Sequence, residues 1–204
     1  MNNLKDFLSI AINKDLPIVK RNQYFTGVGN ASWISSQSII NILFSPLSLD
    51  NFSEMMSKNT SIENQYQAHL NNYYKLFLQY FNGAILFSGN INFYGFSQLK
   101  AIDFNQPPSI FQINQVLMKS PNYISLVFGS AFDKNGEDIY FAFDRSEIEK
   151  VKLIRVSRKK EILLEFENFT EFFIFLNGFC FDNFSSNGKI IETKSRFKNI
   201  VGLV

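Results

Sequence analysis

The clearest alternation of apolar and polar positions lies between residues 73 and 83. Its apolar side chains recur at helical spacing and share one face: Tyr73, Tyr74, Phe77, Leu78 and Phe81. Gly83 follows them, and a glycine at that place commonly ends a helix in the left-handed conformation. The residues after Gly83 have the composition of a strand. The pattern therefore predicts a helix that leads into a β-sheet.

Several shorter helices are expected around this one. Apolar spacing and capping residues predict them at residues 2–13, 39–44, 48–58, 110–119 and 168–179. A stripe from Ser61 runs toward Tyr73, and a bend is expected at Asn71 and Asn72, because asparagine favours helix ends over helix interiors. Gly178 is expected to end the last helix. Residues 17–33 show no period and predict an irregular loop.

Strand patterns fill the second half of the chain. They predict strands at residues 84–87, 91–94, 124–128, 139–143, 151–156 and 162–166. The first two form one hairpin, and the next two form another, in which Asn135-Gly136 supplies the positive φ of a tight turn.

The order of these elements indicates the fold class. Helices, then strands, then a closing helix predict an α+β fold, with a largely antiparallel sheet on which the N-terminal helices and a C-terminal helix pack. We expect residues 1–45 to form an N-terminal extension, a helix plus a loop, packed on the main domain. Residues 46–204 are expected to form that α+β domain together with a C-terminal tail.

Composition and charge narrow the function classes only slightly. The chain has 20 lysines and arginines against 18 acids, and this balance does not predict a polyanionic partner; we expect no direct binding of nucleic acid. Aromatic residues make up 16% of the chain, including 24 phenylalanines, which favours an aromatic core over an aromatic binding surface.

Single copies of cysteine and histidine limit the available chemistry. With only Cys180 and His69, the chain builds no internal disulfide and no cysteine-rich zinc site, which fits the reducing cytoplasm. The N-terminal stripe has charged interruptions unlike a signal peptide, and no run approaches the ~20 apolar residues of a membrane span. We expect a cytoplasmic protein without cofactor, metal or membrane partner. His69 is interpreted as structural or solvated, because no nucleophile motif accompanies it.

Two charged regions have competing interpretations. An enzyme of the carboxylate-dependent hydrolase class would require a pocket that joins at least two of five acids: Asp133, Asp138, Asp144, Glu165 and Glu167. The loop at residues 133–138 lacks the spacing of a helix-loop-helix calcium site. Basic residues gather between positions 145 and 160, and we interpret them as a charged edge strand rather than a nucleic-acid groove.

Three motifs in order resemble the SMI1/KNR4, or SUKH, superfamily. The first runs from Leu70 to Ala84 and is similar to its Leu-Pro-x-x-Tyr-x-x-Phe-Leu-x-x-x-Asn-Gly-Gly signature, with Asn71 in place of proline and Ala84 in place of the second glycine. The second, over residues 126–144, looks like its strand, Gly-Asp-x-Tyr turn and strand, with Glu137 inserted. The third, over residues 166–173, looks like its closing helix. The resemblance covers roughly residues 44–183.

This resemblance implies a function. Many bacterial members of the superfamily are immunity proteins, so it implies a non-catalytic, protein-binding domain that neutralises a polymorphic toxin by binding it. The acidic hairpin tip, Asp133, Glu137 and Asp138, is the expected partner-binding site; its alternative is an ordinary solvated turn. A regulatory scaffold of the same superfamily is the alternative function, ahead of a hydrolase. The sequence does not indicate the toxin or the oligomeric state.

Overall fold

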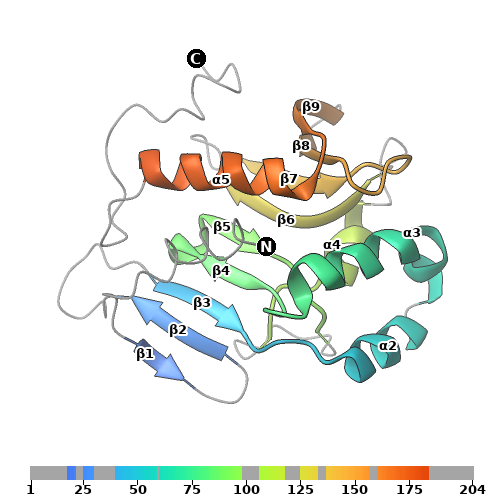
Figure 1. Cartoon of the computed structure of the whole chain (residues 1–204), viewed down its shortest axis with the longest axis horizontal. Helices are drawn as coiled ribbons and strands as arrows, with labels where there is room; N and C mark the ends of the chain where they lie inside the picture. Colours follow the sequence, from blue (N-terminus) through green and yellow to red (C-terminus); the bar gives the residue numbers. More distant parts are fainter. Residues whose placement is uncertain are drawn as a thin grey trace.

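A nine-stranded antiparallel sheet organises the molecule. The computed structural model describes residues 18–21, 25–29, 40–58, 60–97, 106–117, 125–132, 137–156 and 160–183. The strands lie side by side in the order of the sequence, and each pairs antiparallel with the next (Figure 1). They are β1 (Ile18–Arg21), β2 (Phe25–Gly29), β3 (Ile40–Phe44), β4 (Ala84–Leu86), β5 (Ile91–Phe93), β6 (Leu126–Phe132), β7 (Asp138–Phe143), β8 (Val151–Val156) and β9 (Lys160–Phe166).

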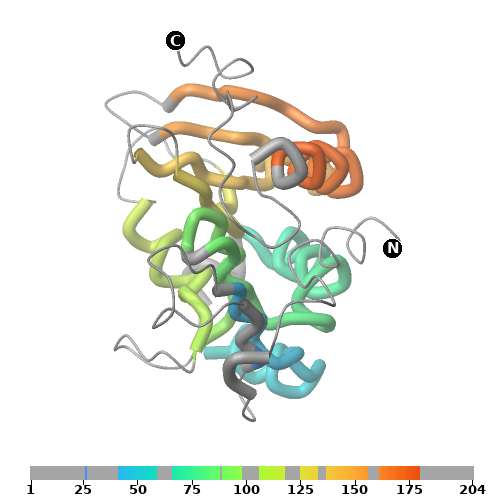
Figure 2. The backbone as a smooth tube through the Cα atoms, turned by 90° about the vertical axis from the view of Figure 1, so that its left-hand side faces the viewer, coloured from blue at the N-terminus to red at the C-terminus, as the bar shows by residue number. Residues whose placement is uncertain are grey.

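Helices cover both faces of this sheet, which confirms the predicted α+β class. They are α2 (Leu49–Lys58), α3 (Thr60–Tyr73), α4 (Ile110–Leu117) and α5 (Phe169–Asn183), with a π-helical turn η1 (Tyr74–Leu78) and a 3-10 turn η2 (Phe87–Gly89). In Figure 2, α3 and α5 lie on one side of strands β6–β9 and α4 lies on the other. Among the described residues, no helix combines the length and the apolar composition that a bilayer crossing requires.

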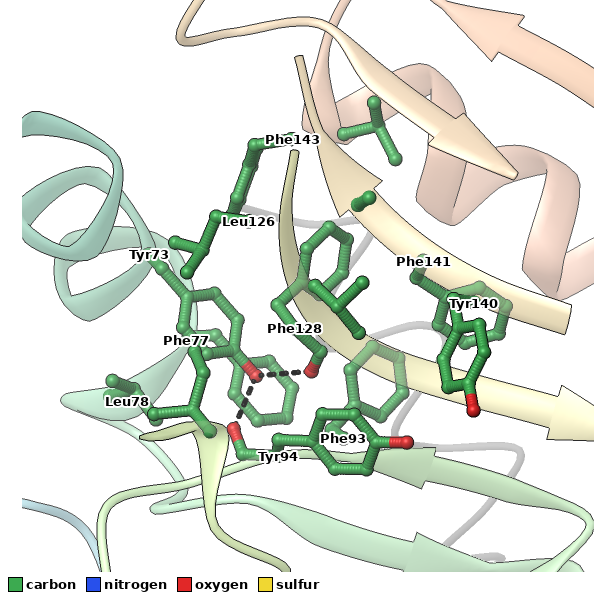
Figure 3. Close-up of a cluster of buried hydrophobic side chains, with 14 of the residues drawn as sticks. Tyr73, Phe77, Leu78, Phe93, Tyr94, Leu126, Phe128, Tyr140, Phe141 and Phe143 are labelled. Carbon is green, nitrogen blue, oxygen red and sulfur yellow. Dashed lines mark hydrogen bonds between the residues drawn. The ribbon is translucent and has the colours of Figure 1, made fainter. Parts of the chain in front are cut away.

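Aromatic rings fill the space between the sheet and the two helices α3 and α5 (Figure 3). Phe77 of η1 stacks on Phe93 of β5 with ring centroids 4.8 Å apart. Phe172 of α5 meets Phe141 of β7 edge to face at 5.0 Å, and all four rings are buried. Such contacts add roughly 0.5–1.5 kcal/mol each to the burial of apolar area. The described aromatic residues thus largely form a core, as their spacing predicts.

Tyr73 contributes a hydrogen bond inside this cluster. Its hydroxyl donates to the carbonyl oxygen of Tyr94 at 2.9 Å and lies 3.4 Å from that of Phe128 (Figure 3). Burial raises the pKa of the Tyr73 phenol well above its ordinary value, so the group remains a donor at any physiological pH. The hydrogen bond ties the end of α3 to strand β6 and to the residue that follows β5.

The turn after η1 depends on Asn82 and Gly83. The side-chain amide of Asn82 donates to the carbonyl of Phe96 and accepts from its N–H, both at 2.8 Å. Gly83 has a φ of +92°, and a Cβ there would lie 2.7 Å from Cβ of Pro107 and 2.9 Å from the carbonyl oxygen of Phe93. Only glycine meets both conditions, which explains the Asn-Gly pair of the first motif.

Asn114 holds α4 against the sheet in a comparable way. Its side chain is fully buried and makes two hydrogen bonds with the backbone of Val127, donating to the carbonyl at 2.8 Å and accepting from the N–H at 2.9 Å. The register of β6 against β7 shifts between Val127 and Gly129. Asn114 therefore satisfies backbone groups at an irregular point of the ladder, where strand pairing is locally disrupted.

The structure confirms most of the expected elements. α2 begins after Ser48, whose hydroxyl oxygen accepts from the N–H of Asn51 at 3.2 Å. α5 begins after Asn168, whose side chain accepts from the N–H of Glu171 at 2.9 Å. α4, β4, β5 and β8 form within the predicted regions, whereas β6 runs on to Phe132, β7 begins at Asp138 and β9 begins at Lys160; the predicted Asn135-Gly136 turn lies outside the described residues.

The N-terminal region differs from the prediction. The described parts of residues 17–33 are strands β1 and β2 rather than an irregular loop, and residues 40–44 form strand β3 rather than a helical turn. Apolar residues in so short a run fit a buried strand as well as a helix. β3 pairs with β4, so the sheet extends across residue 45. The helix predicted at residues 2–13 lies outside the described residues, and the domain boundary at residue 45 stays a prediction.

Two helix irregularities also lie elsewhere than predicted. α3 runs through Asn71 and Asn72, and its non-helical residue is Tyr66, with φ −127° and ψ 17°. α5 passes Gly178 and ends at Asn183. Gly178 does not have the positive φ with which a glycine ends a helix, so the helix continues through it.

Candidate protein-binding surface

The acids predicted to bind a partner stand where β7 begins. Glu137 directly precedes the strand and Asp138 is its first residue; both are exposed, whereas Asp133 lies outside the described residues. Neighbouring residues of a strand point to opposite faces. The Glu137 carboxylate lies 3.6 Å from Nε of Arg155, and that of Asp138 accepts a hydrogen bond from the Tyr140 hydroxyl at 3.2 Å. The structure thus separates Glu137 and Asp138 rather than bringing them together.

Two hydrogen-bonded pairs of polar side chains lie near the start of β7, Tyr140 with Asp138 and Tyr94 with Ser130. Tyr140 lies opposite Ser130 of β6, and the Ser130 hydroxyl oxygen accepts from the Tyr94 hydroxyl at 2.8 Å. Burial, and then the neighbouring Asp138 carboxylate, raise the pKa of Tyr140 to about 12. Both phenols therefore remain neutral donors at physiological pH, because burial also raises the pKa of Tyr94. Tyr140 lies beside Ser130 in the ladder and is joined to the exposed Asp138 carboxylate by its own hydrogen bond.

Apolar side chains flank Asp138 on the same face. Phe132 pairs with Asp138 in the ladder, and Ile162 belongs to the cross-strand row that runs from Tyr140 through Ile154. Phe132 and Ile162 are each 47% exposed. We name Phe132, Asp138, Tyr140 and Ile162 the outer patch. It lies on the face of β6–β9 opposite the one that α5 covers.

The basic residues of β8, and Lys150 directly before it, are paired with acids. Each of three cations contacts two carboxylates: Lys150 contacts Glu147 at 3.0 Å and Glu167 at 3.8 Å, Lys152 contacts Asp144 at 2.5 Å and Glu165 at 3.1 Å, and Arg155 contacts Glu161 at 3.0 Å and Glu137 at 3.6 Å. β8 lies between β7 and β9, so the prediction that this basic run is an edge strand is wrong. The edge is its neighbour, β9.

Asp144 organises the connection between β7 and β8. One carboxylate oxygen accepts from the N–H of Ser146 at 2.8 Å and from that of Glu147 at 3.2 Å, while the other meets Lys152. Burial acts to raise the pKa of Asp144, but the hydrogen bonds from Lys152 and Ser146 together hold that pKa well below its usual range. The hydrogen bond to Asp144 also raises the pKa of Lys152.

His69 has a structural role. Its ring is buried, with 5% exposed, and Nε2 lies 2.6 Å from the backbone carbonyl oxygen of Asp144. A carbonyl only accepts, so Nε2 carries the proton and donates it. The hydrogen bond joins α3 to the end of β7. Of the two predicted alternatives, structural or solvated, the first is confirmed. The side chain of Cys180 lies outside the described part of α5.

Of the acids that a hydrolase would require, two come together. Asp144 and Glu165 both contact the ammonium group of Lys152, which lies between them. Burial acts to raise the pKa of Asp144, but its hydrogen bonds with Lys152 and Ser146 hold that pKa well below its usual range, so Asp144 is not prepared to donate a proton as a general acid. Over the described ranges, no three histidine, cysteine, aspartate or glutamate side chains gather in a way that would hold a metal ion.

Sequence reasoning missed these ion pairs although the sequence contains a signal for them. Lys152 and Glu165 are nearly equidistant from the turn between β8 and β9, as are Arg155 and Glu161, and the ladder pairs them. Counting outward from the turn would have predicted opposite charges across the hairpin. Tyr94 is the residue after β5, whereas Ser130 and Tyr140 come from β6 and β7, and the sequence does not reveal that β5 pairs with β6.

Comparison with known proteins gave one finding. The model of the SMI1 / KNR4 family (SUKH-1) matches residues 60–174, which include α3 to β9 and the first part of α5. No curated protein and no solved structure matches the chain significantly.

Proposed function

We propose that this chain, which belongs to the SMI1/KNR4 family (SUKH-1), is a non-catalytic binding protein of the immunity type that neutralises a bacterial toxin by covering its active cleft. The outer patch carries this proposal. It joins an exposed phenylalanine and isoleucine to an exposed aspartate that accepts a hydrogen bond from a buried tyrosine. Aromatic anchors of this kind, surrounded by polar groups, dominate the affinity of protein interfaces.

The acids around strands β7–β9 and the histidine of α3 already contact other groups of the protein, and this supports binding over catalysis. Asp144, Glu165 and Glu137 each lie against a lysine or an arginine, and His69 is used to join α3 to β7. A general acid or base needs a pKa near the working pH. The strong hydrogen bonds to Asp144 move its pKa in the opposite direction. These side chains stabilise the platform that presents the patch.

Co-expression with the protein encoded by the adjoining reading frame tests the proposal. We expect the wild-type chain to restore growth to cells that express this neighbour, and the doubly substituted Phe132→Lys, Ile162→Lys chain to restore it poorly. Leu49→Lys, Val116→Lys is the matched control, because these side chains are 61% and 63% exposed on α2 and α4. Its rescue should equal that of the wild type.

Three outcomes would overturn the proposal. Cells that die equally with and without the chain exclude neutralisation of this neighbour. Capture of several host proteins and no toxin assigns the chain to the regulatory scaffolds. Turnover of a small molecule by the purified chain, lost on Asp144→Asn, assigns it to the enzymes.

A further inference from the structure

Three polar side chains without a partner lie where α3 meets the connection between β7 and β8. The hydroxyl of Tyr66 and Nδ1 of His69 are buried, and within the described part of the chain neither has a hydrogen-bond partner. Arg145 is exposed, and no ion pair of the described residues includes it. Native proteins rarely leave a buried polar group without a partner, because this costs free energy. All three groups therefore retain the capacity to bond a ligand.

These three groups form one cluster. Tyr66 and His69 lie three residues apart on α3, and their rings meet edge to face with centroids 5.8 Å apart. Nε2 of His69 donates to the carbonyl oxygen of Asp144, and Arg145 is the next residue. Burial raises the pKa of the Tyr66 hydroxyl, and the positive charge of Arg145 acts to lower it, so this charge lies near the hydroxyl. The helical geometry of α3 is also interrupted at Tyr66.

The acids of the same connection leave Arg145 available. Asp144 and Glu147 contact lysines instead, and Glu149 is exposed to solvent. A guanidinium that makes no ion pair can donate two parallel hydrogen bonds to an anion. The cluster thus combines one cationic donor with two buried polar atoms that have no partner.

The hydrogen-bonding roles of the cluster select the kind of anion. The Tyr66 hydroxyl and the Arg145 guanidinium can donate, whereas Nδ1 of His69 only accepts, because the proton of the ring is on Nε2. A ligand that satisfies all three must accept at two points and donate at a third. Carboxylate and sulfate carry no proton at neutral pH, so they only accept. Inorganic phosphate carries at least one proton at that pH, so it can do both.

We propose that Tyr66, His69 and Arg145 bind a phosphate group that carries a proton. Arg145 and the Tyr66 hydroxyl donate to phosphate oxygens, and the P–O–H group donates to Nδ1 of His69. Hydrogen bonds with a charged partner are roughly twice as strong as neutral ones. The cluster belongs to α3, which lies on the side of the sheet opposite the outer patch (Figure 2). The inference therefore does not rest on the proposed function.

Binding of phosphate and of sulfate to the full-length chain tests this inference. Isothermal titration calorimetry at pH 7, in a buffer without phosphate, compares the two ions at equal ionic strength. We expect inorganic phosphate to bind at least about ten-fold more tightly than sulfate, because only phosphate can donate to Nδ1 of His69. Glycerol phosphate offers the same group on a larger molecule, and tighter binding of this monoester would identify phosphomonoesters as the source of the group.

Two substitutions make the test specific to the cluster. Tyr66→Phe removes the hydroxyl and keeps the ring, so it should weaken phosphate binding at least about ten-fold. It should not lower the melting temperature measured without phosphate, because this hydroxyl has no described partner to lose. Arg145→Gln should also weaken binding at least about ten-fold. Lys75→Gln removes an exposed cation from η1 and is the matched control, which should bind as the wild type does.

Three results would overturn the proposal. Equal binding of phosphate and sulfate would indicate an adventitious ion only, held by charge. Unchanged phosphate binding in Tyr66→Phe and Arg145→Gln would place the anion elsewhere on the chain. A Tyr66→Phe chain that melts earlier without phosphate, yet binds phosphate as the wild type does, would assign the hydroxyl to the fold alone. None of these results changes the expected rescue from the toxin, so this inference and the proposed function fail separately.

Discussion

Residues of the family signature act on the fold rather than on a ligand. Tyr73 donates to the carbonyl of Tyr94, Phe77 stacks on Phe93, and Asn82 bonds both backbone groups of Phe96. These contacts join the end of α3, η1 and the turn that follows it to β5 and the residues just after β5. The signature residues thus connect one helix end to the sheet. Their hydrogen bonds and the space available to each side chain explain the residue types.

Gly83 provides the sharpest prediction at this scale. Gly83→Ala should lower the free energy of unfolding by about 3 kcal/mol, because the new Cβ meets Pro107 and Phe93 and the backbone has positive φ. Urea unfolding of the purified chain measures this change.

Gly89 is the matched control for Gly83. It has the same φ of +92°, but a Cβ there has no neighbour within 4 Å. Gly89→Ala should therefore cost only the backbone strain, about 1 kcal/mol. Equal costs at the two positions would contradict the steric part of this explanation.

The sequence predicted the positive φ of Gly83 but wrongly placed it at the helix end, since the helix ends at Leu78 and Gly83 directly precedes β4; it did not predict the partners of Tyr73. A glycine after a helical stripe has a local meaning, since helix ends commonly require positive φ. The carbonyls that the Tyr73 hydroxyl reaches come from residues 21 and 55 positions further along the chain. Only the pairing of β5 with β6 brings them together, and that pairing depends on the tertiary fold.

At the scale of elements, the connection from β7 to β8 combines two uses of Asp144. Its carboxylate caps the turn at Ser146 and pairs with Lys152, while its carbonyl accepts from His69 of α3. Helix, turn and strand therefore meet at one residue. The sequence predicted hairpin β8–β9 from local alternation. It did not predict that β8 lies between β7 and β9, because a local pattern does not specify the order of strands in a sheet.

The stability of the protein in acid should depend on the ion pair between Asp144 and Lys152. The ordinary pKa of Asp144 is 3.8, and its folded pKa is lower. Below pH 3.8 the unfolded chain therefore binds the proton first, so this contribution to stability is complete above pH 3.8 and is lost as pH falls through the folded pKa. Lys152→Met should reduce the slope of unfolding free energy against pH between about pH 2 and pH 4.

Lys58→Met is the control for this measurement. Lys58 pairs with Glu54 on α2 and lowers the pKa of that carboxylate, but both side chains are more than half exposed. Exposed pairs of this kind contribute little to stability, so the pH slope should change much less than it does on Lys152→Met. A Lys152→Met chain with an unchanged slope would show that Asp144 is not held by this lysine.

The whole molecule is larger than its family core. The family match begins at residue 60, yet β3 lies against β4 and contributes Leu43 and Phe44 to the interior. Asn41 is fully buried and accepts from the N–H of Phe87 at 2.7 Å. The predicted α+β class was right because the order of helices and strands specifies layers. The strands before residue 45 were missed because their runs are short.

Truncation tests where the stable unit begins. A chain of residues 46–204 should be less stable than a chain of residues 40–204 by about 4 kcal/mol or more, since it loses two buried apolar side chains of roughly 2–3 kcal/mol each. Thermal melting of the two proteins measures the difference. Identical melting would place the boundary at residue 45, where the sequence suggests it, and would show that β3 is dispensable.

The sequential order of the strands bears on how the chain is made. Every strand pairs with the one just before it, so a ribosome releases each new strand beside a partner that has already emerged. Neighbour pairing of this kind keeps loop-closure costs small and favours fast folding. The face of β6 and β7 that carries Phe128 and Phe141 nevertheless stays uncovered until α5 is synthesised, because Phe169 and Phe172 of α5 cover these two rings. During translation, that unfinished side is where chaperones would find apolar surface.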